Sequence, residues 1–102
     1  FNRRGEAFDQ GETFSGVDYA AGLAAVEELR PLVPEGATLA QLALRWILAF
    51  PDVTTTIPGA RTAEQAEANA RAGDLPAPSP EIMARVRDVY DRHLRAAVHD
   101  RW

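Results

Sequence analysis

The stretch of sequence best suited to chemistry is a turn between a β-branched segment and a helical pattern. The segment 53–57, VTTTI, ends at Pro58-Gly59, and Arg61 stands just before the helical pattern begins. This order leaves backbone N–H groups free beside the positive end of a helix dipole. Arg61 adds a forked donor suited to phosphate, and Gly59 has no side chain that would keep a ligand away from the backbone. The stretch therefore predicts an anion site.

Two side-chain amides follow the turn. Gln65 and Asn69 are four residues apart, so both project from one face of the predicted helix and are placed to contact an adenine edge or a ribose oxygen. A simpler interpretation stays open, because many turns contain Gly or Pro for geometry alone. In that interpretation Arg61 is a solvated charge, and Gln65 completes a capping box with Thr62.

Other candidate residues indicate no catalytic or metal site. His93 lies near an apolar stripe and is interpreted as a packed or helix-end histidine, whereas His99 is interpreted as solvated. Neither stands beside a recognisable nucleophile, so no catalytic residue is assigned. No pair of histidines has metal-binding spacing, and the sequence has no cysteine, so neither a metal site nor a disulfide is predicted.

Composition narrows the class of protein. The 102 residues have a formal net charge of -4, and 46% of them are hydrophobic, which is typical of one small globular domain. The acidic balance argues against a nucleic-acid surface. No apolar run approaches the ~20 residues that span a bilayer, and no signal peptide is visible, so no membrane partner and a cytoplasmic location are expected. The first residue is Phe1, and we expect the chain to be a piece of something longer.

The elements around the turn are predicted from caps and periodicity. Thr38 can cap a helix over 38–50 that is apolar on two sides and so needs neighbours on both. Ser79 and Pro80 mark the start of the last helix. The predicted order is a loop over 1–17, a helix pair over 18–50, a strand over 53–57, a helix over 62–72, a helix over 79–95 and a tail over 96–102.

The strand predicted over 53–57 stands alone. Its backbone groups need partners on both edges if the strand is buried, and no other run in the sequence has comparable strand character. We therefore expect the chain either to self-associate or to pair with segments outside these residues.

The run LAQLALRWILAFPDVTTTIPGARTAEQAEANARAGDLPAPSPE resembles the C-terminal part of an aldo/keto reductase, an NADPH-dependent enzyme. The beginning, FNRRGEAFDQGETFSG, is similar to the long loop after the seventh strand of that family, so the resemblance covers nearly the whole chain. It implies an α/β fold, the C-terminal segment of a TIM (β/α)8 barrel, which taken alone is mostly helical with a single strand. The segment 53–57 would be the eighth strand of the barrel.

The resemblance also implies a cofactor and a substrate class. Gly59, Ala60, Arg61, Gln65 and Asn69 would hold the adenosine 2′-phosphate end of NADP, and the whole enzyme would reduce an aldehyde or a ketone. The catalytic tetrad of the family, an Asp, a Tyr, a Lys and a His, finds no match in this sequence, which contains no lysine. We expect these residues alone to reduce nothing. The alternative is a free-standing helical module that binds nucleotides or self-associates without catalytic activity.

Overall fold

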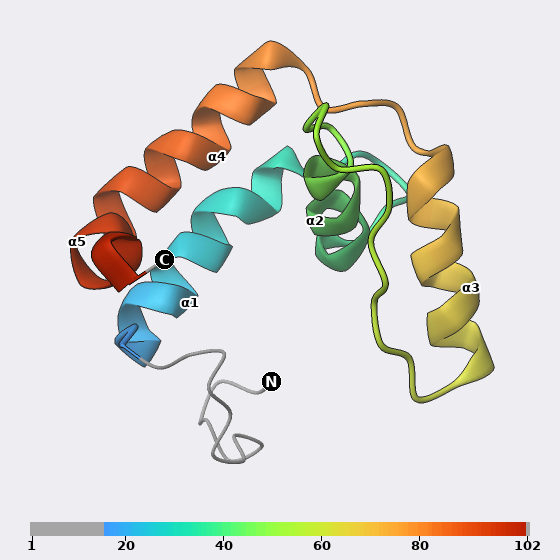
Figure 1. Ribbon diagram of the computed structural model, residues 1–102, viewed down its shortest axis with the longest axis horizontal. Helices are drawn as coiled ribbons and strands as arrows, with labels where there is room; N and C mark the ends of the chain where they lie inside the picture. The colour runs from blue at the N-terminus through green and yellow to red at the C-terminus, as the bar shows by residue number, and fades with distance from the viewer. Residues whose placement is uncertain (1–15, 102) are drawn as a thin grey trace. The chain divides into compact units, whose positions relative to one another are not determined.

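The computed structural model describes residues 16–101, which form two compact units that are described separately here. All the regular secondary structure of the described residues is helical, and open segments connect the helices (Figure 1). The α-helices are α1 (Tyr19–Leu29), α2 (Leu39–Ile47), α3 (Ala63–Arg71), α4 (Pro80–His93) and α5 (Arg95–Val98), and short 3₁₀ turns are η2 (Arg30–Leu32), η3 (Ala72–Asp74) and η4 (His99–Arg101).

Of the described residues, the first unit joins 16–31 with 85–101. Asp18 caps α1, because its Oδ2 accepts a hydrogen bond from the backbone N–H of Ala21 at 3.1 Å. Glu28 near the end of α1 pairs with Arg92 of α4, which ties the first helix to the last long one.

The second unit, Leu32–Ala84, contains the predicted anion site. Gly36 has a φ of 77°, a left-handed conformation that favours glycine, and it turns the chain toward α2. Thr38 and Gln41 then form a complete capping box, in which each side chain accepts from the backbone of the other. The helices α2 and α3 contact each other and both contact η3. Leu42 and Ala72 are the buried apolar residues of this unit.

The strand predicted over 53–57 is wrong for the described residues. Residues 53–60 form an open segment without helix, strand pairing or a turn closed by its own backbone hydrogen bond, and no strand occurs anywhere in 16–101. The physical reason is that a strand requires hydrogen bonds to a neighbouring strand, and residues 16–101 supply none. Ile57, at 92% exposure, and Phe50, at 37%, show how much apolar surface this arrangement leaves open.

The predicted helices are otherwise confirmed with smaller bounds. The segment 38–50 is helical only over Leu39–Ile47, and the single helix predicted over 79–95 ends at His93, after which α5 follows. Ser79 caps α4 as predicted, with its Oγ 3.2 Å from the backbone N–H of Ile82. The tail predicted over 96–102 is wrong up to residue 101, because α5 and η4 continue the helical backbone.

Two predictions fall partly or wholly outside the described residues. The loop predicted over 1–17 lies outside them up to residue 15, and so does the end of the tail at Trp102. In the part of the chain from residue 16 to 101, no helix is long and apolar enough to cross a membrane, and no group of three or more His, Asp or Glu side chains could hold a metal ion.

Candidate anion site on the Gly59–Arg61 turn

The turn that precedes α3 is held by two side-chain amides of that helix. The Oε1 atom of Gln65 accepts a hydrogen bond from the backbone N–H of Arg61 at 2.8 Å. The Nδ2 atom of Asn69 donates to the carbonyl oxygen of Gly59 at 3.2 Å. Both ends of the three-residue turn are therefore bonded to the same helical face, as the spacing of four residues allows.

The start of α3 carries half of the predicted capping box. Thr62 is the N-cap, and its Oγ1 accepts from the backbone N–H of Gln65 at 3.2 Å. The reciprocal bond is absent, because the side chain of Gln65 accepts from Arg61 and not from the N-cap residue. The interpretation that Gln65 completes a capping box is therefore wrong: the bond between its side chain and the N-cap backbone is not made, and the amide bonds the turn at Arg61 instead.

Arg61 presents an exposed cation at the positive end of α3. No carboxylate of residues 16–101 lies within ion-pair distance of its guanidinium. The next basic side chain along the helix is different, since Arg71 lies 3.7 Å from a carboxylate oxygen of Glu67. An exposed guanidinium beside backbone N–H groups at a helix start can bind a phosphate by donating charge-assisted hydrogen bonds to it.

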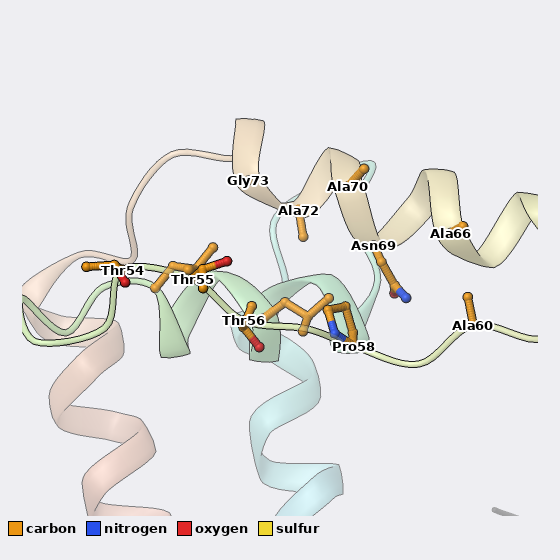
Figure 2. Close-up of a pocket in the computed structure, with 12 residues that line it drawn as sticks. Thr54, Thr55, Thr56, Pro58, Ala60, Ala66, Asn69, Ala70, Ala72 and Gly73 are labelled. Atoms are coloured by element: carbon orange, nitrogen blue, oxygen red, sulfur yellow. The ribbon is translucent and has the colours of Figure 1, made fainter.

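A hollow of about 440 Å³ lies between the open segment and α3. Figure 2 shows Thr54, Pro58 and Ala60 along one side, and Asn69 projecting from α3 on the other. The remaining residues that line it are Leu44, Leu48, Thr55, Thr56, Ala66, Ala70, Ala72 and Gly73. The lining is mostly apolar, with threonine hydroxyls and one amide as its polar groups, so the turn borders a space with room for a small organic group.

Two polar side chains of α2 position the helix that carries the site. The Nε2 atom of Gln41, which is buried, donates to the carbonyl oxygen of Ala68 in α3 at 2.9 Å. The Nε atom of Arg45 donates to the carbonyl oxygen of Leu75 at 2.7 Å, just after η3. In the sequence these two residues only interrupt an apolar pattern, and nothing in their spacing indicates which carbonyls they reach 27 and 30 residues away.

The five residues predicted for the site lie together. Gly59, Ala60 and Arg61 form the turn, and Gln65 and Asn69 follow on the adjoining face of α3. The sequence does not indicate that both amides are hydrogen-bonded to the backbone of the turn. Among residues 16–101, the guanidinium of Arg61 and the backbone N–H of Ala60 have no hydrogen-bond partner. The second polar atom of each amide, Nε2 of Gln65 and Oδ1 of Asn69, is also left without one within this range.

Both histidines lie in the first unit, each beside an ionisable partner. The Nε2 atom of His93 is 2.6 Å from Oε1 of Glu28, and Nδ1 of His99 is 2.9 Å from the hydroxyl of Tyr90. Hydrogen bonds from Arg92, and next from His93, lower the pKa of the Glu28 carboxyl from its ordinary 4.5 to about 2. His93, the partly buried last residue of α4, matches the packed or helix-end histidine that the sequence predicts, and it lies beside the ion pair of Glu28 and Arg92 that joins α1 to α4.

Comparison with known proteins identifies a matching family and a similar sequence. Residues 2–91 match the Aldo/keto reductase family. A curated relative, described as a probable voltage-gated potassium channel subunit beta from Arabidopsis thaliana, is 36% identical over 66 residues, which is 63% of this chain. The chain spans about 20% of the length of that relative. No solved structure matches the chain significantly.

Proposed function

The chain belongs to the aldo/keto reductase family, and from that membership we propose that it supplies the adenosine 2′-phosphate site of an NADP-dependent reductase. The substrate of the whole enzyme is a small aldehyde or ketone. The cofactor is held by Gly59, Ala60, Arg61, Gln65 and Asn69. When bound, NADPH supplies the hydride that reduces the carbonyl carbon, and the residues of this chain bind and orient its adenosine end.

The observation that carries this proposal is the free guanidinium of Arg61. A doubly charged phosphate needs donors that are not already neutralised, and no carboxylate of the described residues pairs with this side chain. The Thr62 cap orients α3 so that its positive end lies beside the same turn. The donor set therefore fits a 2′-phosphate, the group that distinguishes NADP from NAD.

The open segment 53–60 supports the assignment of the chain to a (β/α)8 barrel. In the described residues, no backbone N–H or carbonyl between 54 and 58 has a hydrogen-bond partner. Ile57 is 92% exposed. A β-branched segment with two unpaired edges is suited to insertion between two other strands, as the eighth strand of a closed barrel would be. The partner in this proposal is the rest of the barrel, which also brings the catalytic tetrad, and the cytoplasm is the compartment we assign to the enzyme.

The test is a titration of the full chain with NADPH and with NADH while the fluorescence of the reduced nicotinamide is followed. We expect saturable binding with a clear preference for NADPH, because only NADPH carries the extra phosphate. Competition by adenosine 2′,5′-bisphosphate, but not by adenosine 5′-monophosphate, should show that the phosphate is the recognised group. No fluorescence change with either cofactor up to millimolar concentration would contradict the proposal.

A further inference from the structure

Within the described residues, Arg45 is a partly buried cation that has no carboxylate partner. It lies in the last turn of α2, and no carboxylate of residues 16–101 comes within ion-pair distance of it. Its Nε atom instead donates to the carbonyl oxygen of Leu75 at 2.7 Å. A partly buried charge needs a compensating partner, so carbonyl groups have to supply one here.

Two helical segments end beside this cation. Arg45 belongs to the last turn of α2, and Leu75 directly follows η3, which continues α3. The carboxyl end of a helix carries a partial negative charge of about half an elementary charge. The electrostatic partners of Arg45 are therefore the ends of α2 and of the α3–η3 segment, which explains how its charge is stabilised without a carboxylate.

Leu75 is the residue at which the chain leaves the helical conformation. Its ψ of 148° is extended, and the connection 75–78 leads from there to α4. Two prolines of this connection have no backbone N–H. In the part of the chain that the structure describes, the bond from Arg45 is the one side-chain hydrogen bond to the backbone of 75–78. This bond therefore holds the end of the α3–η3 segment against α2.

We propose that Arg45 is a positioning residue: it fixes the direction of α3 by holding the far end of the α3–η3 segment, and so sets where α3 presents the Gly59–Arg61 turn. Gln41, one helical turn earlier on the same face of α2, donates to Ala68 within α3. Two contacts separated along a segment fix its orientation, whereas a single contact leaves a pivot. The inference rests on the proposed function, because the direction of α3 matters for binding only if the anion site lies at its start.

Substitutions of Arg45 can separate its hydrogen bond from its charge. In Arg45→Gln the Nε2 atom stands the same number of bonds from the backbone as the Nε atom of arginine, so the donor is kept and the charge is removed. Arg45→Met has a similar length but neither donor nor charge. Arg71→Met is the matched control, because it removes an exposed cation from the last turn of α3 whose side chain bonds no backbone carbonyl of residues 16–101.

Two NMR measurements on the free full chain test the bond and its effect. The Nε–H of Arg45 should exchange with water about ten- to a hundred-fold more slowly than that of Arg87, which is exposed and unbonded within residues 16–101, as a hydrogen bond from a charged donor predicts. Residual dipolar couplings of α3, fitted in the frame of α2, should shift in Arg45→Met and stay as in the wild type in Arg45→Gln and Arg71→Met.

Three results of these measurements would overturn the inference. The first is equal exchange of the two Nε–H groups, which would mean that the bond to Leu75 does not persist. The second is a set of α3 couplings in Arg45→Met that still fits the wild-type orientation. The third is the same shift in Arg45→Gln as in Arg45→Met, which would mean that the hydrogen bond is not what directs α3.

The consequence for binding is measured by titration with adenosine 2′,5′-bisphosphate, well below the unfolding midpoint of every variant. Arg45→Met should weaken binding about three- to ten-fold, because the ligand has to order a helix that is free to pivot, while Arg45→Gln should stay within about two-fold of the wild type. Equal affinities of Arg45→Met and the wild type would contradict the positioning role. If the wild-type chain does not bind this nucleotide, the proposed function fails, whereas the dipolar couplings of the free chain still decide whether Arg45 directs α3.

Discussion

The Nε2 atom of Gln41 lies 2.9 Å from the carbonyl oxygen of Ala68 and donates a hydrogen bond to it, so that one buried amide joins α2 to α3. The same amide, through its Oε1, accepts from the backbone N–H of Thr38 at 3.0 Å. One side chain therefore caps the start of α2 and fixes α3, the helix that carries the candidate anion site.

Replacing this amide should destabilise the second unit. Gln41→Leu preserves the approximate volume but leaves the carbonyl of Ala68 and the N–H of Thr38 without their partners. We expect a loss of about 2 kcal/mol in the free energy of unfolding, from the lost capping-box bond to the N–H of Thr38 and one unsatisfied carbonyl. Urea denaturation followed by far-UV circular dichroism measures it, with Glu64→Ala as the exposed control. An unchanged midpoint in Gln41→Leu would show that the contact contributes nothing.

Arg61→Ala should change the discrimination between cofactors. Because the guanidinium is exposed and no carboxylate of residues 16–101 pairs with it, its removal should leave the fold unaffected. Charge-assisted hydrogen bonds to a phosphate contribute about 1.5–3 kcal/mol, so NADPH should bind roughly ten- to a hundred-fold more weakly. NADH should bind as before. Equal loss for the two cofactors in fluorescence titrations would refute the role of Arg61, and Arg71→Ala, which removes a cation from the end of the same helix, is the control.

The ion-pair cluster of the first unit predicts a pH dependence of stability. Hydrogen bonds from Arg92 and His93 depress the pKa of Glu28 to about 2, below its ordinary 4.5. A depressed pKa means that the folded state binds this proton less readily than the unfolded state, so the contribution is complete above pH 4.5 and is lost as the pH falls toward 2.

Glu28→Gln should remove this part of the pH dependence. The variant should unfold at a lower temperature than the wild type at pH 7, and the difference should shrink between pH 4.5 and 2. Thermal unfolding followed by circular dichroism at several pH values measures it. Glu35→Gln, a substitution of an exposed carboxyl before α2, is the control. A difference that stays constant down to pH 2 would mean that the charge of Glu28 is not what stabilises the cluster.

Ile57→Lys should reduce any self-association of the chain. Ile57 is 92% exposed in a segment with unpaired backbone groups, a combination that favours pairing with another copy when the rest of a barrel is not present. Burial of one isoleucine contributes about 1.5–3 kcal/mol, so the variant should need a roughly ten- to hundred-fold higher concentration to associate. Sedimentation velocity over a concentration series measures it, and Ala40→Lys adds the same charge on an exposed position of α2. A wild-type chain that stays monomeric throughout would contradict this expectation.

Features of this fold that depend on nearby residues could be predicted from the sequence, whereas features that depend on distant residues could not. The caps at Thr38, Thr62 and Ser79 were predictable because a cap depends on residues two or three positions away. The strand over 53–57 was not, since its state depends on other strands that residues 16–101 do not provide. The positions of the five candidate site residues follow from the order of β-branched segment, turn and helix in the sequence. The bonds of Gln65 and Asn69 do not, because a side-chain amide has several partners within reach and only the packed backbone selects among them.

Pro58 makes the open segment unequal on its two sides. If residues 53–59 adopt strand geometry, one border displays the main-chain groups of Val53, Thr55, Ile57 and Gly59, each with both an N–H and a carbonyl. The opposite border displays those of Thr54, Thr56 and Pro58, and the last of these has no hydrogen to give. A neighbouring strand on the first side finds an N–H and a carbonyl at every residue that faces it. A neighbour on the second side lacks one hydrogen bond at Pro58, beside the Gly59–Arg61 turn, so the two edges of the segment are not equivalent in any sheet that includes it.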